Sequence, residues 1–99
     1  MRVFLLFFAF VFLACGGTSG SNSYKDRAEQ AYRNGQELLS DGNYLEALTS
    51  FNRVKNEFPY SPYAALSSLA IGEVYFEEEK YIEAIDVFRL FVRSYPEHP

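Results

Sequence analysis

The amino-acid sequence predicts an all-α protein built from two tandem helix–turn–helix units. Apolar residues recur at steps of three and four in four segments, which is the spacing of one face of a helix. The chain also repeats itself at a period of 37 residues, and periods of this size are typical of stacked helical arrays. The matching pairs are Gly35 with Gly72, Tyr44 with Tyr81, Glu46 with Glu83, Ala47 with Ala84, Phe51 with Phe88 and Pro59 with Pro96.

The first unit is expected over residues 24–60. Its first helix runs over Tyr24–Ser40 and stops before Gly42, which can adopt the left-handed conformation of a helix cap. Asn43, with Glu46 three residues later, predicts a capping box at the start of a second helix that runs to about residue 57. The predicted apolar faces are Ala28, Ala31, Gly35, Leu38 and Leu39 in the first helix, and Ala47, Leu48, Phe51 and Val54 in the second.

The second unit is expected over residues 61–99. Ser61 followed by Pro62 predicts an N-cap with proline at the first helical position, where a missing N–H does no harm. This helix runs to about Glu78, and the next covers Tyr81–Ser94 after a short turn. The residues predicted to face inward are Ala65, Leu69, Gly72, Tyr75 and Phe76, then Ala84, Ile85, Phe88, Phe91 and Val92.

The last residue of the chain, Pro99, occupies the repeat position of Pro62, where a third unit would start. Repeat arrays cover the hydrophobic face of each unit with the next unit, so we expect a truncated array with one uncovered face. That face is expected to include some of Leu66, Leu90, Phe91 and Val92.

Two glycines lie in the middle of predicted helices. Gly35 and Gly72 each cost a helix about 1 kcal/mol relative to alanine, so their presence needs a reason. Close approach of two helices is one such reason. We expect Gly35 to face the residues near Ala47, and Gly72 to face those near Ala84.

Residues 1–14 have the form of a signal peptide. Arg2 precedes an unbroken apolar run over Val3–Leu13. A run of this length is too short for a hydrocarbon core that needs about 20 helical residues, and it fits the apolar region of a secretory signal. The run ends at Ala14-Cys15, which resembles the bacterial lipobox; an ordinary signal peptide cleaved near Ala14 or Gly17 is the alternative.

The lipobox resemblance implies cleavage before Cys15 and attachment of diacylglycerol to its sulfur, with an N-acyl chain such as palmitate. Several acyl chains together make membrane attachment stable. The remainder of residues 15–23 is rich in glycine and serine and predicts a flexible tether. By resemblance to lipoprotein sorting, Gly16 after the cysteine favours the outer membrane.

Charge and composition exclude several classes of function. The chain has 9 basic and 13 acidic residues, and this acidity argues against binding of nucleic acid. A single cysteine and a single histidine, Cys15 and His98, leave no basis for a disulfide framework or a Cys/His metal site. Glu77-Glu78-Glu79 is interpreted as a solvated helix end. We therefore expect no catalytic residues, no metal and no cofactor apart from the covalent lipid.

The 37-residue unit resembles the tetratricopeptide repeat, whose period is about 34 residues. The three additional residues lie between Pro59 and Gly72. Asn34 and Ser68 occupy positions where that family prefers large apolar residues, which predicts looser packing there. The residues that carry the resemblance are the small Gly35 and Gly72, the alanines Ala47 and Ala84, the aromatic Phe51 and Phe88, and the terminating Pro59 and Pro96.

A narrower resemblance is to the BamD family of the outer-membrane β-barrel assembly machinery. It is carried by the strings Phe58-Pro59-Tyr60-Ser61-Pro62-Tyr63-Ala64, Tyr81-x-x-Ala84-Ile85, Phe88-x-x-Phe91-Val92 and Tyr95-Pro96-x-His98-Pro99, in combination with the lipobox. The resemblance covers the mature chain but only the N-terminal part of that family. It implies a non-enzymatic, lipid-anchored scaffold on the periplasmic face of the outer membrane.

The same resemblance implies two kinds of partner, other subunits of the assembly machinery and unfolded segments of outer-membrane proteins. Two alternatives stay open: a periplasmic tetratricopeptide adaptor for envelope or cell-division machinery, and the docking segment of a longer enzyme. In tetratricopeptide arrays the first helices of successive units line a peptide-binding groove. The candidate groove residues are Tyr32, Gln36, Leu39, Leu69, Glu73 and Phe76, of which Leu69 and Phe76 could instead fill the seam between the units.

Overall fold

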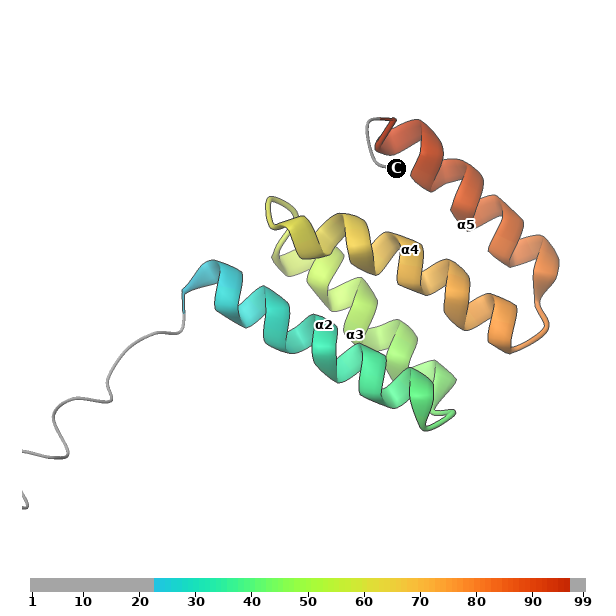
Figure 1. Ribbon diagram of the computed structural model, residues 1–99, viewed down its shortest axis with the longest axis horizontal. Helices are drawn as coiled ribbons and strands as arrows, with labels where there is room; N and C mark the ends of the chain where they lie inside the picture. The colour runs from blue at the N-terminus through green and yellow to red at the C-terminus, as the bar shows by residue number, and fades with distance from the viewer. Residues whose placement is uncertain (1–22, 97–99) are drawn as a thin grey trace, which may run out of the picture.

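The computed structural model describes residues 23–96 and contains, within that range, four helices and no strand. The helices are α2 (Tyr24–Ser40), α3 (Tyr44–Glu57), α4 (Pro62–Glu77) and α5 (Tyr81–Ser94). Each helix packs against the next one, and α4 also contacts α2, so that two helix pairs stack side by side (Figure 1). The predicted all-α stack is confirmed. The predicted signal peptide, Cys15, most of the tether and residues 97–99 lie outside the described residues.

The two helix pairs turn with the same backbone geometry, 37 residues apart. In each turn an N–H, that of Asn43 or that of Lys80, donates to the carbonyl five residues earlier at 2.8 Å. This bond is typical of a Schellman cap, which places the preceding residue in the left-handed region. Gly42, with φ 80°, confirms the predicted cap, whereas Glu79 adopts φ 62° with a full side chain. Such a conformation costs a residue other than glycine roughly 1–2 kcal/mol.

The starts of the helices differ from the expectation. Ser23 caps α2, because its Oγ accepts a hydrogen bond from the N–H of Asp26 at 3.2 Å. The capping box predicted at Asn43 is wrong: this residue closes the preceding turn with ψ 71°, outside the extended region that an N-cap needs, and its side chain makes no cap bond. Ser61 has an extended backbone at the start of α4, but its Oγ instead donates to the carbonyl of Phe58 at 2.9 Å.

The hydrophobic core lies where α3 meets α4. Phe51 and Val74 are fully buried there, and Tyr32 and Leu48 pack against the cluster from its margin. Because α4 is enclosed by α2, α3 and α5, it has buried residues on most of its circumference. The members of the cluster are Ala47, Phe51, Ala70, Ile71 and Val74.

The two mid-helix glycines allow aromatic rings to reach the helix backbone. A Cβ at Gly35 would lie 2.6 Å from Cε1 of Phe51, and one at Gly72 would overlap the ring of Phe88 in the same way. The predicted close approach is therefore present. The glycines face the rings of Phe51 and Phe88, one helical turn after Ala47 and Ala84, because an aromatic side chain fills the space that the missing Cβ leaves.

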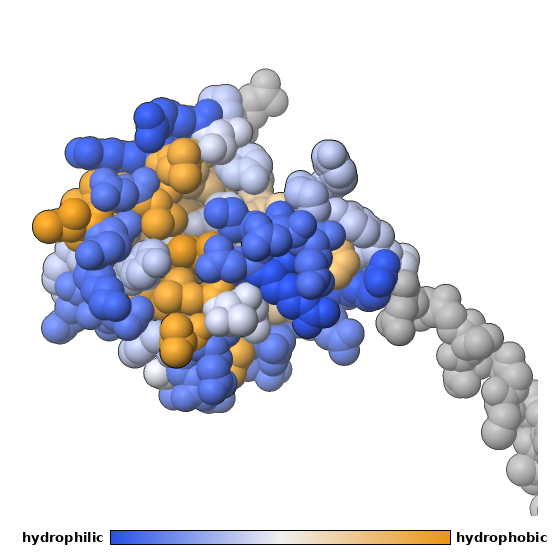
Figure 2. Space-filling view, turned by 180° about the vertical axis from the view of Figure 1, so that it is seen from behind, coloured by the Kyte–Doolittle hydropathy of each residue, from blue (hydrophilic) through white to orange (hydrophobic). Residues whose placement is uncertain are grey.

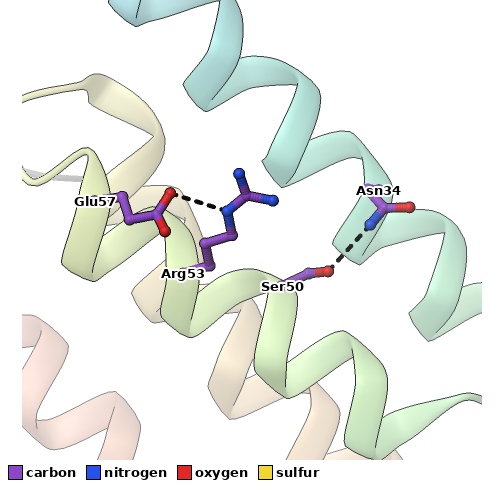
Figure 3. Close-up of polar contacts among 4 residues, drawn as sticks. All are labelled: Asn34, Ser50, Arg53 and Glu57. Carbon is purple, nitrogen blue, oxygen red and sulfur yellow. Dashed lines mark hydrogen bonds and ion pairs between the residues drawn. The ribbon is translucent and has the colours of Figure 1, made fainter.

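One face of α2 is polar and exposed, whereas the residues at the same repeat positions of α4 are buried. Asn34 on this face donates to Ser50 at 3.2 Å, and Arg53 pairs with Glu57 at 2.9 Å nearby (Figure 3). The corresponding face of α4 packs into the core with α3. Among residues 23–96, this face of α2 has no core of its own: its residues are exposed, with contacts to the α3 side such as that of Asn34 with Ser50. The exposed residues Arg27, Gln30, Arg33, Asn34 and Glu37 take the repeat positions of the buried Ala64, Ser67, Ala70, Ile71 and Val74.

The outer face of α5 is apolar, and no other helix among residues 23–96 covers it. Leu90 and Val92 are 53% and 64% exposed, and hydrophobic side chains gather at the left of Figure 2, the side of the molecule that carries α5 (Figure 1). This agrees with the predicted uncovered face, except that Phe91 is buried at 7% exposure and Leu66 is half-buried. The inward positions predicted for Ile85 and Val92 are wrong, because α5 packs on one neighbour, α4, among the described helices.

Candidate functional site

A groove of about 780 Å³ lies between the two helix pairs. The C-terminal halves of α2 and α4 form its walls, and the turn between α2 and α3 closes one end. The first helices of the two units thus face a common space, as the repeat pattern predicts. The lining residues are Tyr32, Gln36, Leu39, Ser40, Asp41, Gly42, Tyr44, Phe51, Ala70, Glu73, Phe76, Glu77 and Phe88.

Five of the six predicted groove residues lie in this lining. Tyr32, Gln36 and Leu39 come from α2, and Glu73 and Phe76 come from α4. Leu69 is half-buried and does not line the groove. It lies one turn before Glu73, so it precedes the part of α4 that borders the open space.

Sequence reasoning missed the contribution of the second helices. Tyr44 reaches the groove from the start of α3, and Phe88 reaches it from the middle of α5. The signal for both was present in the repeat, since Tyr44 matches Tyr81 and Phe51 matches Phe88. The sequence pattern predicts only internal packing for Phe51 and Phe88. The rings of Phe51 and Phe88 pack against Gly35 and Gly72 and also line the groove.

Tyr32 is the most connected side chain of the groove. Its ring lies 5.7 Å from that of Phe51 and 5.6 Å from that of Tyr63, measured between centroids. The amide of Gln36 donates to the phenol oxygen of Tyr32 at 3.1 Å. Burial, followed by the negative charge of Glu73, raises the pKa of Tyr32 above its ordinary value of 10.0. Tyr32 is therefore a neutral, fixed, amphipathic surface at neutral pH.

Phe76 presents an apolar surface on the opposite wall. It is 55% exposed, and its ring makes an edge contact with Tyr81 at 5.4 Å between centroids. This contact fixes one side of the ring and leaves the other side open to the groove. An exposed ring held in this way can pack against an apolar side chain of a bound peptide without rearrangement.

The charged residues of the groove are all acidic. Asp41, Glu73 and Glu77 belong to the lining, which contains no lysine and no arginine. These carboxylates can accept hydrogen bonds from peptide N–H groups or from basic side chains. The groove thus combines apolar surfaces with acceptors, and it disfavours acidic ligands.

Over residues 23–96, no group of three or more histidine, cysteine, aspartate or glutamate side chains is arranged to hold a metal ion. Within the same stretch, none of the helices has both the length and the apolar character needed to cross a membrane. Glu77 lines the groove, and Glu78 lies 3.4 Å from Lys80 in an ion pair.

Two helix pairs related by 37 residues, each with a glycine under an aromatic ring, define a tetratricopeptide-like repeat protein. Residues 24–99 match the family model YfiO, described as outer membrane lipoprotein. The chain belongs to the YfiO family of outer membrane lipoproteins.

Individual relatives agree with the family match. The chain is 34% identical over 77 residues to the outer membrane protein assembly factor BamD of Caulobacter vibrioides, a match that covers 77% of this chain and 25% of the relative. It is 30% identical over 94 residues to BamD of Pasteurella multocida, covering 94% of this chain and 35% of the relative. The BamD of Neisseria meningitidis serogroup B is 34% identical over 74 residues, with 72% of this chain and 27% of the relative covered. The similarity to BamD is thus confirmed, and the matches cover about a quarter to a third of the relatives' length.

Proposed function

We propose that this chain is a lipid-anchored scaffold that binds peptide segments during the assembly and insertion of outer-membrane β-barrel proteins. The observation that carries the proposal is the groove between α2 and α4, in a chain whose relatives are named outer membrane protein assembly factor BamD. The role is one of binding and not of catalysis. Its partners are unfolded segments of outer-membrane proteins and other subunits of the assembly machinery.

The chemistry of the groove suits an extended segment that carries aromatic or aliphatic side chains. Tyr32 and Phe76 supply ring surfaces on opposite walls, and Leu39 adds an aliphatic one. Gln36 and Glu73 lie among these apolar residues and can bond the peptide backbone. A few polar groups within an apolar lining are the usual means by which a binding site fixes the orientation of its ligand. Membrane-protein segments, which alternate apolar and polar residues, match this surface.

The anchor places the groove at the membrane. Cys15 follows the apolar run of the leader, and Gly16 follows Cys15. Diacylglycerol and an N-acyl chain on Cys15 would hold the chain on the periplasmic face of the outer membrane, where unfolded barrel proteins arrive. The family description as outer membrane lipoprotein supports this location.

The groove is tested by peptide binding. A fluorescent peptide that alternates aromatic and polar residues is titrated with the mature chain, and anisotropy is measured for the parent, Phe76→Ala and Glu73→Gln. We expect Phe76→Ala to weaken binding about tenfold, the effect of losing roughly 1.4 kcal/mol at a well-placed aromatic residue. Leu45→Ala is the matched control, because Leu45 is an exposed apolar residue outside the lining. Equal losses in Phe76→Ala and Leu45→Ala would contradict the proposed site.

The anchor is tested by metabolic labelling with a clickable fatty acid. We expect label on the parent and none on Cys15→Ser, which should also remain unprocessed or become soluble. Equal labelling of both proteins would remove Cys15 as the attachment point and the outer-membrane location with it.

A further inference from the structure

Among the large hydrophobic residues of 23–96, Tyr60 is the most exposed, and it belongs neither to the groove nor to the outer face of α5. Tyr60 lies at the apex of the turn between α3 and α4, and 93% of it is exposed. Apart from Tyr24, which contacts the same turn, the other exposed large hydrophobic residues lie elsewhere. Leu45, Tyr81 and Ile82 lie at the starts of α3 and α5, and Phe76 lines the groove. Ile85, Leu90 and Val92 are exposed on α5. Tyr60 thus marks a separate surface.

The turn that carries Tyr60 is rigid. The N–H of Ser61 donates to the carbonyl of Phe58 at 3.1 Å, and the hydroxyl of Ser61 donates to the same oxygen at 2.9 Å. Phe58 is buried beneath the turn, and Pro59 and Pro62 limit the backbone on either side of Tyr60. An exposed aromatic side chain on a turn held in this way keeps a defined direction relative to the folded body.

The same turn lies beside the start of α2. The N–H of Tyr60 donates to the phenol oxygen of Tyr24 at 3.1 Å, and the ring of Tyr24 contacts that of Phe58 with centroids 5.2 Å apart. Figure 1 shows this end of α2 next to the connection between α3 and α4. Arg27 places its guanidinium 5.8 Å from the centre of the Phe58 ring. Exposed tyrosine and cationic side chains therefore share one end of the molecule.

The length of chain between Cys15 and this end limits its distance from the membrane. Residues 16–23 separate Cys15 from Tyr24. Eight residues span at most about 28 Å when fully extended. The opposite end of the helix pair lies one helix length further away, about 21 Å for a helix of 14 residues such as α3.

We propose that the turn between α3 and α4 is the membrane-contacting end of the folded body, with the ring of Tyr60 lying among the lipid headgroups. The inference rests on the proposed lipid anchor at Cys15. Tyrosine suits this place, because its ring favours the acyl boundary and its hydroxyl favours water. Lys25 and Arg27 lie close enough in sequence to Tyr24 to face the phosphates of the same headgroups. The contact orients the groove relative to the bilayer, which a tether alone does not.

The natural absence of tryptophan makes the test direct. Tyr60→Trp and Leu45→Trp each introduce one probe at an exposed position, on opposite ends of α3. The lipidated mature chains are reconstituted into vesicles of phosphatidylethanolamine and phosphatidylglycerol, with and without brominated acyl chains. We expect Tyr60→Trp to shift its emission to the blue and to lose at least half of its intensity to bromine, and Leu45→Trp to do neither. Circular dichroism checks that both variants keep the parent's helix content.

Flotation of the same vesicles separates this inference from the anchor. A chain that floats with the vesicles while Tyr60→Trp stays unquenched overturns the inference and leaves the anchor standing. Equal quenching at both positions also overturns it, because the body would then lie flat on the bilayer. A lipid-bearing chain that does not float shows that the anchor itself fails, and the inference fails with it.

Discussion

The contact between Gly35 and Phe51 gives the sharpest test of the packing. Alanine at position 35 would place its Cβ 2.6 Å from Cε1, 2.8 Å from Cδ1 and 2.9 Å from Cζ of Phe51. Carbon atoms in van der Waals contact lie about 3.5–4.0 Å apart, so the ring would have to move by about 1 Å. Phe51 is fully buried between Tyr32 and the core residues of α4, so it has little room to do so.

Two opposing terms set the size of the effect. Replacing glycine by alanine in a helix contributes about 1 kcal/mol of stability, whereas overpacking a well-filled core costs about 1–3 kcal/mol. We expect Gly35→Ala to lower the free energy of unfolding by about 1 kcal/mol. The matched variant is Gly72→Ala. Its Cβ would meet Phe88, but that ring is only half-buried and borders open space, so it can move aside. We expect Gly72→Ala to be neutral or stabilising by up to about 1 kcal/mol.

Urea unfolding followed by circular dichroism measures both variants. The double variant Gly35→Ala, Phe51→Leu should lose less stability than the sum of its two single variants, because the smaller side chain makes room for the new methyl group. If Gly35→Ala stabilised the chain by the full helix-propensity term, the close contact would not be the reason for the glycine. Equal destabilisation by Gly35→Ala and Gly72→Ala would show that the open side of Phe88 gives its ring no freedom.

Three further outcomes follow from single features of the fold. Glu79→Gly should stabilise the chain by about 1 kcal/mol in thermal unfolding, because Glu79 holds the left-handed conformation that Gly42 adopts in the matching turn. Glu79→Ala is the control, since alanine keeps the conformational penalty. A similar gain in stability from Glu79→Ala would show that the effect comes from removing the charge. The exposed apolar face of α5 should make the chain self-associate, which sedimentation at increasing concentration measures. The double variant Leu90→Lys, Val92→Lys should reduce this self-association, whereas Leu45→Lys should leave it unchanged. A parent chain that stays monomeric at high concentration would contradict the prediction. Because the pKa of Tyr32 is raised on folding, its contribution to stability is fully present below the unfolded pKa of about 10 and is lost as the pH rises through the folded pKa. Glu73→Gln should lower the pKa of Tyr32 in a tyrosinate absorbance titration, with Tyr32→Phe identifying the signal, and an unchanged titration would exclude Glu73 as a cause.

Local and periodic features were readable from the sequence. The helix boundaries follow from apolar spacing and from turn residues such as Gly42, and the two units follow from the 37-residue repeat. Five of the six residues predicted for the groove line it, because residues at the same position of successive units face the same side of a stack. The relation of Gly35 to α3 was predictable as a close approach, since a glycine in the middle of a helix is costly unless something lies against it.

Tertiary packing decided how deeply each inward-pointing side chain is buried, because burial depends on how many helices surround it. Phe51 and Phe88 hold the same repeat position, yet Phe51 is fully buried and Phe88 is only half-buried, because α4 covers α3 while α5 has no second neighbour among residues 23–96. Ile85 and Val92 have an inward helical pattern but remain exposed for the same reason. Periodicity specifies the direction in which a side chain points. Whether anything lies in that direction depends on how the helices pack, which also placed Tyr60 beside the start of α2, 36 residues away in sequence.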